Sequence, residues 1–238
     1  MSGKVSSKIV IDGLVLNLDG ANPKSYLSGS TDWYDLTYYK NNGTLTNGPS
    51  FDTNNGGSIV FDGTNDYVDC GNSNSLKFFD GDSFTICSWV KPNPTMSAGV
   101  IVQHGGEPNS ATGFAFYLAN GYVEFAKSNV ANTGQNITTT PFINNEWNHI
   151  CCSIKYSGSS GQIKFYVNGV LKSTFNGWSA NPNISDYTRP LNVGRSEADA
   201  FFNNLPFKGN ICNVSIYNRI LTPSEILQNY NALKNRFI

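Results

Sequence analysis

Strand-like segments separated by turn residues follow one another along almost the whole chain, and they constrain its fold more than any other feature. Each segment is rich in the β-branched and aromatic residues that suit a pleated sheet. The segments lie at residues 13–19, 57–61, 67–70, 83–91, 99–104, 114–119, 122–127, 147–156, 162–167, 170–175, 191–194 and 207–217. So many short strands with turns between them predict an all-β sandwich or barrel.

Asn-Gly pairs predict how these strands are joined. Asn120-Gly121 and Asn168-Gly169 each lie between two of the segments. A two-residue type I′ turn prefers this pair, so antiparallel hairpins are expected at both places. Residues 58–70 read as a strand, a tight acidic turn at Asp62-Gly63 and a second strand, which predicts a further hairpin.

One segment near the end of the chain predicts a helix, over residues 222–233. Thr222 suits the N-cap, Pro223 suits the first helical position, and Glu225 completes a capping box. Apolar residues then recur at helical spacing, which predicts one face packed against the edge of a sheet. These residues are Ile226, Leu227, Tyr230 and Leu233. We interpret the helix as a terminal lid.

The length of 238 residues fits one large β domain or two small ones. No repeat or linker divides the chain, so we favour one domain over residues 13–238, preceded by a polar arm and strand entry over residues 1–12. Residues 22–55 and 176–190 read as two long loops. Such loops often carry binding residues, although covering a sheet edge is an equally good interpretation.

Charge and hydropathy exclude several partners. The formal net charge is −1 and no cluster of Lys and Arg is present, so the sequence does not predict nucleic-acid binding. No run of about eighteen apolar residues could span a bilayer. The first eight residues are polar and lack the apolar core of a signal peptide, so export by the ordinary route is not expected.

The chain has five cysteines, an odd number in a chain far larger than a disulfide-stapled miniprotein. They are Cys70, Cys87, Cys151, Cys152 and Cys212. Most lie inside strand-like runs, where a free cysteine behaves as a small hydrophobe. We predict that they are reduced and buried; the alternative is a metal site, but no Cys-x-x-Cys pair or Cys/His cluster with ligand spacing is present.

The order of these pieces resembles the concanavalin A-like jelly roll, in its laminin G-like branch, from about residue 13 to residue 233. The motifs that carry the resemblance are SIVFDGTNDYV at residues 58–68, SFTICSWVKP at 83–92, WNHI at 147–150, IKFYVNG at 163–169, FKGNI at 207–211 and YNRILTPSEI at 217–226. The resemblance implies an antiparallel jelly-roll β-sandwich with a short C-terminal helix.

The beginning of the chain is similar to a subset of these domains found in phage and other viral structural proteins. Residues 13–26, GLVLNLDGANPKSY, carry this similarity together with WYDL at 33–36 and NGTLTNGP at 42–49. It implies a virion protein assembled in the host cytoplasm, with a capsid or tail protein as partner, and homo-oligomers are compatible with such a role. Reduced cysteines and the missing signal peptide agree with this setting.

The acidic turn is a candidate calcium site. Oxygen donors gather within one turn at Asp62, Asn65, Asp66 and Asp69, and a hard cation needs several such oxygens. The alternative is plain turn chemistry, which uses the same residue types for bonds to the backbone, and we favour it. The resembling family often adds an acidic residue from its closing strand, where this chain has Asn210, Cys212 and Asn213.

Carbohydrate binding is predicted from aromatic and polar residues near the ends of the expected sheets. The candidate residues are Trp178, Tyr187, His104, Glu107 and Phe201. Aromatic rings suit sugar faces, but they also fill sandwich cores, which is the interpretation we favour for Trp89 and Trp147.

Catalysis is not predicted. Glucanases of the resembling superfold present two glutamates and a central aspartate on one strand, where residues two apart face the same side. Glu197 and Asp199 begin this pattern, but Phe201 takes the place of the second glutamate. The sequence therefore predicts a non-enzymatic virion protein, a capsid decoration or fibre module that also binds glycans. The alternatives are a lectin-like module of a microbial surface protein and a glycoside hydrolase.

Overall fold

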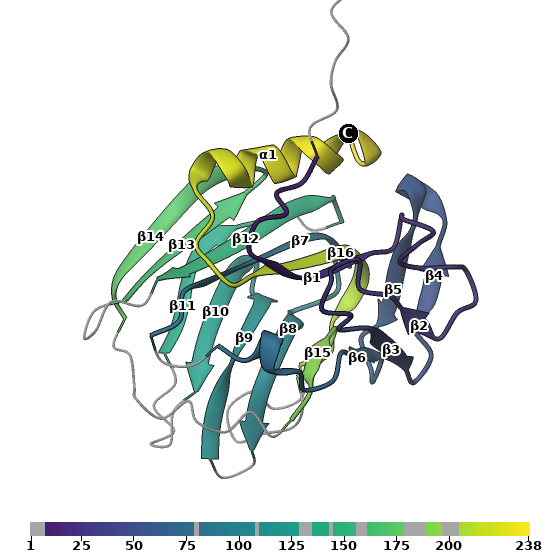
Figure 1. The fold of residues 1–238 in the computed structure, drawn as a ribbon, viewed down its shortest axis with the longest axis horizontal. Helices are drawn as coiled ribbons and strands as arrows, with labels where there is room; N and C mark the ends of the chain where they lie inside the picture. Colours follow the sequence, from purple (N-terminus) through teal and green to yellow (C-terminus); the bar gives the residue numbers. More distant parts are fainter. Residues whose placement is uncertain are drawn as a thin grey trace, which may run out of the picture.

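The computed structural model describes residues 8–78, 81–107, 110–128, 135–142, 145–155, 161–178, 189–196 and 205–238. Within these ranges two antiparallel sheets pack face to face as a sandwich, with one α-helix across the top of it (Figure 1). The prediction of an antiparallel jelly-roll sandwich with a short C-terminal helix is confirmed. No helix in the described ranges is long and apolar enough to cross a membrane.

In the described part of the chain each sheet contains eight strands, and every strand pair is antiparallel. Sheet A holds, in spatial order, β14 (Val170–Trp178), β13 (Gly161–Val167), β12 (Asn148–Lys155), β7 (Phe84–Pro92), β16 (Lys208–Tyr217), β5 (Ser58–Asp62) and β4 (Ser50–Asp52), with β1 (Leu14–Asp19) also paired to β16. Sheet B holds β11 (Gln135–Pro141), β10 (Tyr122–Ser128), β9 (Ser110–Ala119), β8 (Ala98–Glu107), β15 (Leu191–Val193), β6 (Tyr67–Asp69), β3 (Gly43–Thr46) and β2 (Asp32–Trp33).

Both Asn-Gly turns form the predicted hairpins. Asn120 and Gly121 have φ values of 51° and 84°, and Ala119 pairs with Tyr122 across the turn. Asn168 and Gly169 have φ values of 53° and 77° between β13 and β14. Two consecutive positive φ values define the type I′ turn, which a β-branched residue could not adopt without strain.

The predicted hairpin at residues 58–70 is wrong. β5 pairs with β4 and β16 in sheet A, whereas β6 pairs with β3 and β15 in sheet B. The acidic turn therefore carries the chain from one sheet to the other. Ile59 and Phe61 enter the core between the sheets from sheet A, and Val68 enters the same core from sheet B.

The stretch at residues 22–55 is also more ordered than predicted. It contains β2, β3 and β4 and ends within a short 3₁₀ helix, η1 (Asn54–Gly56). Trp33, in β2, is fully buried in the core. The second predicted loop begins later than expected, because β14 continues to Trp178; residues 179–188 lie outside the described residues.

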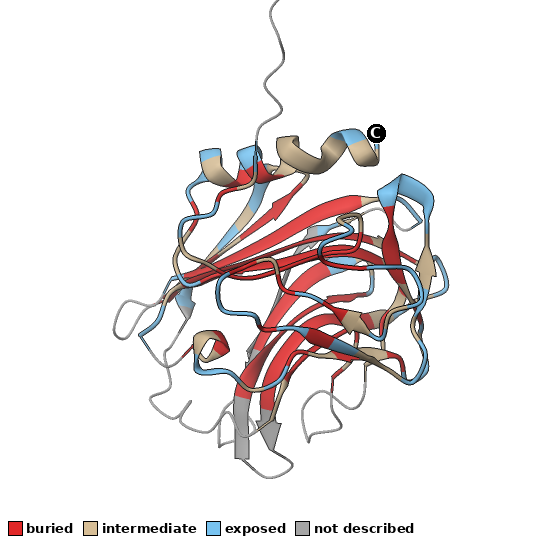
Figure 2. Ribbon diagram, turned by 45° about the vertical axis from the view of Figure 1, so that its right-hand side comes forward, coloured by how far each residue is buried: buried red, intermediate tan, exposed pale blue. Residues whose placement is uncertain are grey.

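Helix α1 (Pro223–Leu233) begins as predicted. The Thr222 hydroxyl accepts from the Glu225 backbone N–H, and the Glu225 carboxylate accepts from the Thr222 backbone N–H. The helix lies on the outer face of sheet A and is followed by η3 (Lys234–Arg236) (Figure 2). Its contact face differs from the prediction in one place.

Leu227 points to solvent with 44% of its surface exposed, and Asn229 is buried instead. The Asn229 side chain accepts from the Val10 backbone N–H and donates to the Tyr217 hydroxyl, at 2.8 and 3.0 Å. A buried amide is tolerated there because both of these groups satisfy it. Asn229 thereby joins the helix to both the entering chain and β16.

The capping residue Glu225 predicts an acid-sensitive helix. The Arg219 guanidinium and the Thr222 N–H and hydroxyl hold the pKa of Glu225 at about 2. Because the folded pKa lies below the unfolded value of about 4.3, this stabilisation is present above that pH and is lost as the pH falls toward 2. We expect Glu225→Gln to lower the free energy of unfolding by about 1–2 kcal/mol near neutral pH, allowing for partial exposure.

Urea denaturation of both proteins at a series of pH values measures this effect. The difference between them should shrink steadily below about pH 5. A difference that does not change with pH would contradict the role assigned to the Arg219–Glu225 pair, whose nitrogen and oxygen lie 2.6 Å apart.

The two tryptophans predicted to be core residues, Trp89 and Trp147, differ in burial. Trp89 is buried, but it lies beneath the helix side of sheet A, where its ring stacks on Tyr230 and Phe237. Trp147 is only half-buried, so its assignment to the core is wrong. It precedes β12 at the sheet end, and its indole Nε1 donates to the Asn55 side chain at 3.1 Å.

The prediction that all cysteines are reduced is wrong for two of them. Cys87 of β7 and Cys151 of β12 stand opposite each other, with Cα atoms 4.1 Å apart, and a disulfide joins them. They are separated by 64 residues, so only the strand pairing brings them together. Cys70, Cys152 and Cys212 are free and buried, as predicted.

Candidate functional site

Among the predicted carbohydrate-binding residues, only His104 has a side chain within the described part of the chain. It is fully buried in β8, and its ring nitrogens lie 3.0 Å from the Leu76 carbonyl oxygen and 3.3 Å from Asn72 Oδ1. Burial lowers the pKa of His104 to about 4, so the ring is neutral near pH 7. His104 therefore holds residues 72–76 from the inside of the protein.

The other candidates cannot be placed around a ligand. Trp178 and Glu107 belong to β14 and β8, but their side chains lie outside the described residues. Tyr187 and Phe201 lie outside them entirely, as do Glu197 and Asp199. Carbohydrate binding by these residues stays a prediction.

In the acidic turn, two carboxylates bond to the backbone of the turn itself. Asp62 Oδ1 accepts from the Thr64 N–H at 2.7 Å, and Asp66 Oδ2 accepts from the Asp62 N–H at 2.9 Å. The bond from Thr64 lowers the pKa of Asp62, whereas burial raises the pKa of Asp66. These bonds are the turn chemistry that competes with a metal for the same oxygens.

The remaining two members of the predicted calcium site bond elsewhere. Asp69 Oδ1 accepts from the Gly71 N–H at 2.8 Å, and the Asn65 carbonyl oxygen accepts from Asn47 Nδ2 at 2.9 Å. The turn is thus braced by hydrogen bonds at both ends, and calcium binding by Asp62, Asn65, Asp66 and Asp69 stays a prediction.

Thermal denaturation tests the calcium site. Calcium that binds only the folded protein raises the melting temperature by mass action, by an amount that grows with its concentration. We expect an Asp62→Asn variant to lose any such rise. Equal melting temperatures in calcium and in EDTA would leave the turn without a role in metal binding.

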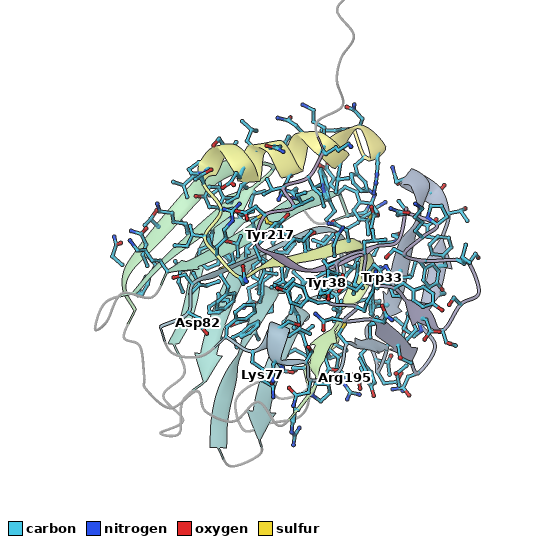
Figure 3. All side chains as sticks on the ribbon, viewed as in Figure 1. Trp33, Tyr38, Lys77, Asp82, Arg195 and Tyr217 are labelled. Carbon is cyan, nitrogen blue, oxygen red and sulfur yellow. A yellow bond between two sulfur atoms is a disulfide. The ribbon has the colours of Figure 1, made fainter. Side chains whose placement is uncertain are left out.

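A different group of residues forms a polar hollow of about 260 Å³ on the surface. It opens where the loop at residues 34–42 meets residues 74–78, which begin with the 3₁₀ helix η2 (Asn74–Leu76), and Asp82. The hollow, which we call the tyrosine pocket, is lined by Val15, Tyr39, Asn74, Ser75, Lys77, Phe78, Asp82 and Asn218. Figure 3 labels Lys77 and Asp82 of this lining and the neighbouring Tyr38.

The buried Asp35 holds the loop that carries the tyrosines. Its carboxylate accepts from the backbone N–H groups of Asn17, Thr37 and Asn41, each at 2.9 Å. It also accepts from the Thr37 hydroxyl at 2.6 Å. A charged acceptor with this many donors fixes the backbone on both sides of Tyr38 and Tyr39 before any ligand arrives.

A second set of bonds joins the loop to the opposite wall of the tyrosine pocket. Asn41 Nδ2 donates to the Val15 carbonyl oxygen and to Ser75 Oγ, both at 2.9 Å. Ser73 caps η2, and its hydroxyl lies 3.0 Å from that of Ser75. With His104 bonded to Leu76 from within, both walls are fixed to the sandwich.

The exposed groups of the pocket suit a sugar. Tyr39 lines the pocket and exposes 48% of its surface. Tyr38 lies beside the lining and exposes 93%, and its ring centroid lies 6.2 Å from that of Tyr39 in an edge-to-face arrangement. Aromatic faces pack against the apolar C–H faces of sugar rings, while amides, hydroxyls and charges bond to sugar hydroxyls. The pocket supplies these polar groups as Asn74, Ser75, Lys77, Asp82 and Asn218.

A larger hollow of about 370 Å³ lies between the entering chain and the C-terminal end, but its chemistry is poorer. Its walls include Ile11, Leu14 and Leu233. Its polar lining residues are Lys8, Asn17, Asp19, Asn22 and Arg236, of which Asp19 and Arg236 bond to each other at 2.8 and 3.1 Å. The lining of the tyrosine pocket is mostly polar and includes an exposed tyrosine ring, so we treat this pocket as the candidate site.

Sequence reasoning missed the tyrosine pocket because its residues lie far apart in the chain. The available signal was the adjacent pair Tyr38-Tyr39 within a polar loop. Two neighbouring tyrosines in such a stretch indicate aromatic rings at the surface, but nothing in the sequence pairs them with residues 74–82.

The comparison with family models decides the family. The model described as the concanavalin A-like lectin/glucanases superfamily matches residues 62–227, which is more than half of the chain. The chain belongs to this superfamily. The resemblance noted from the sequence motifs is thereby confirmed, whereas membership of the viral subset stays a prediction. None of the curated proteins compared with the chain matches it.

Several solved structures share the fold at low sequence identity. The binding domain of Paraclostridial Mosquitocidal Protein 1 has a TM-score of 0.67 and 18% identity, covering 92% of this chain and 52% of that one. The receptor binding domain of botulinum neurotoxin C/D mosaic serotype has a TM-score of 0.67 and 14% identity, covering 92% and 51%. The superfamily domain described here thus spans about half the length of these toxin structures.

A third structure is matched over nearly its full length. Domain 4 of AbnA, a GH43 extracellular arabinanase from Geobacillus stearothermophilus, was solved in complex with arabinotriose. It has a TM-score of 0.65 and 19% identity, covering 91% of this chain and 98% of that one. At these identities the likeness shows the shared fold of the superfamily and nothing more.

Proposed function

We propose that this chain is a non-enzymatic carbohydrate-binding module and that the tyrosine pocket is its binding site. The observation that carries the proposal is the pair of exposed rings, Tyr38 and Tyr39, on a loop whose backbone the buried Asp35 holds beside a polar hollow. A loop whose backbone is already held loses little conformational freedom when a ligand binds.

The solved structures support the proposal by analogy of fold. The AbnA domain holds arabinotriose, and another of the similar structures concerns botulinum neurotoxin type C and its interaction with two ganglioside molecules. A third is a neurotoxin binding domain in complex with rat synaptotagmin II. Proteins with this fold thus include binders of saccharides and of receptors, and the residues of the tyrosine pocket favour a saccharide as the ligand of this chain.

A glycan array with the purified protein tests the proposal. We expect saccharide-selective binding that a Tyr38→Ala/Tyr39→Ala double variant loses. The Trp178→Ala variant tests the competing site and should bind the saccharide as the wild type does. A blank array would count against carbohydrate binding, and loss of binding only in the Trp178 variant would move the site away from the tyrosine pocket.

We propose further that the module works on the surface of a virion, as a capsid decoration or part of a fibre. The support is the similarity of residues 13–26, 33–36 and 42–49 to domains of phage and viral structural proteins. Its partners are then a capsid or tail protein and a cell-surface glycan. Mass spectrometry of purified particles should find the protein in many copies, and its absence from particles favours the lectin-like module of a microbial surface protein.

The hydrolase alternative is tested with the same ligand. We expect the saccharide selected by the array to remain intact after prolonged incubation with the protein, because binding by tyrosine rings and amides supplies no acid and nucleophile pair. Release of new reducing ends, abolished by Glu197→Gln, would establish the glycoside hydrolase instead.

A further inference from the structure

Four side chains form a square on the outer face of sheet A, beneath α1. Cys87 stands opposite Cys151 in the register of β7 and β12, and Trp89 stands opposite His149. Residues two apart on a strand face the same side, so all four side chains point away from the core between the sheets. Cys87 and Cys151 pack with Tyr166, Tyr217 and Ile226 in a second hydrophobic cluster under the helix.

Three of these side chains carry atoms that can bind a metal, and these atoms lie close together. The ligand atoms of Cys87, Cys151 and His149 all lie within 4.8 Å, and all three residues are buried. Cys151 Sγ lies 3.7 Å from His149 Nε2 and 3.9 Å from Nδ1. In the described part of the chain no other Cys, His, Asp or Glu forms such a group.

We propose that Cys87, Cys151 and His149 form a buried site for a thiophilic closed-shell cation, Zn²⁺ or Cu⁺, when the disulfide between the two cysteines is reduced. Thiolate and imidazole are the donors that these cations select over Mg²⁺ or Ca²⁺. Reduction frees the two sulfurs to move apart, so that a shared cation can lie about 2.3 Å from each sulfur and about 2.0 Å from the imidazole nitrogen.

Conversion of the disulfide to a metal site requires a dithiol reductant and the cation. A dithiol reductant transfers two electrons and two protons to the sulfur–sulfur bond and becomes a disulfide itself, leaving the Cys87 and Cys151 thiols. The cation then displaces the two thiol protons to the solvent. No other co-reactant is needed.

The surroundings support a bound cation. Aromatic rings cover this region on the helix side. The Trp89 ring stacks on Tyr230 and Phe237, and the Tyr230 ring centroid lies 5.9 Å from that of His149. The His149 backbone N–H donates to Asn168 Oδ1 at 2.9 Å, which fixes the strand position.

Two features distinguish the candidate cations. Two thiolates and a neutral imidazole leave no net charge around Zn²⁺ and one negative charge around Cu⁺, and a buried site prefers neutrality. A set of three donors, in contrast, suits Cu⁺ better than Zn²⁺, which almost always takes four ligands. The experiment therefore has one arm for each ion.

The test uses the full chain, reduced with a dithiol under anaerobic conditions and freed of the reductant. Zn²⁺ alone or Cu⁺ alone is added, and bound metal is counted after desalting. The Cys87→Ser/Cys151→Ser and His149→Phe variants remove ligands, and Cys152→Ser is the matched control, because Cys152 is equally buried but faces the core between the sheets.

We expect about one ion per reduced chain in the wild type and in Cys152→Ser, and less than about one tenth of that in the ligand variants and in the oxidised wild type. X-ray absorption should show two sulfur ligands and one nitrogen ligand. Equal binding in the oxidised protein or in Cys87→Ser/Cys151→Ser, or no binding by the reduced folded chain, would overturn the proposal. The comparison of oxidised with reduced wild type stands even if a variant fails to fold.

Discussion

Replacing Asp35 with alanine should lower the free energy of unfolding by about 3–4 kcal/mol, because the buried N–H groups that it accepts lose their partner. Three backbone N–H groups, from Asn17, Thr37 and Asn41, and the Thr37 hydroxyl point at this carboxylate. Only 2% of Asp35 is exposed, so water cannot replace it without opening the loop. Urea denaturation measures the change.

Asp32→Ala is the matched control, in β2 just before this loop. Its carboxylate accepts from the Tyr34 hydroxyl at 3.3 Å in an exposed contact, so we expect a change within about 0.5 kcal/mol. Asp35 is a positioning residue for the tyrosine pocket, and the Asp35 variant should also lose sugar affinity. Comparable stability of both variants would contradict the role given to the Asp35 hydrogen bonds.

The second large effect concerns the rings themselves. Tyr38→Ala and Tyr39→Ala should each weaken binding of the array-selected saccharide about tenfold or more, which corresponds to about 1.4 kcal/mol. The two rings contact each other, so the double variant should lose more than either single one. Isothermal titration calorimetry gives the three affinities.

Tyr122→Ala is the control for exposed tyrosine in general. Tyr122 exposes 42% of its surface at the turn between β9 and β10 and lines no part of the tyrosine pocket. Its removal should leave the affinity unchanged. The melting temperatures of all the tyrosine variants should equal that of the wild type. An equal loss in Tyr122→Ala would indicate nonspecific contact between sugar and protein.

Much of the fold could be predicted because its signals are local. The Asn120-Gly121 turn demands two positive φ values in succession, and the capping box at Thr222 and Glu225 requires only neighbouring residues. Each of these elements was predicted in the right place. Strands β2, β3 and β4 were missed because they are two to four residues long and lack a strand-length hydrophobic run.

What could not be predicted depends on contacts between distant segments. A turn between two strands has the same sequence pattern whether the strands pair with each other or enter different sheets, which is why the sequence of residues 58–70 predicts a hairpin. Cys87 meets Cys151, and Tyr39 meets Asn74, only after the strands take their order in the sheets. The disulfide and the tyrosine pocket therefore follow from topology rather than from spacing.

Binding of a saccharide in the tyrosine pocket can be tested by chemical-shift mapping of the labelled protein with the array-selected saccharide. We predict that the amides of residues 38–41 and 74–77 shift in a saturable manner, while those of Gly121 and Tyr122 do not. Shifts that leave residues 38–41 and 74–77 unchanged while others respond would contradict binding in the tyrosine pocket.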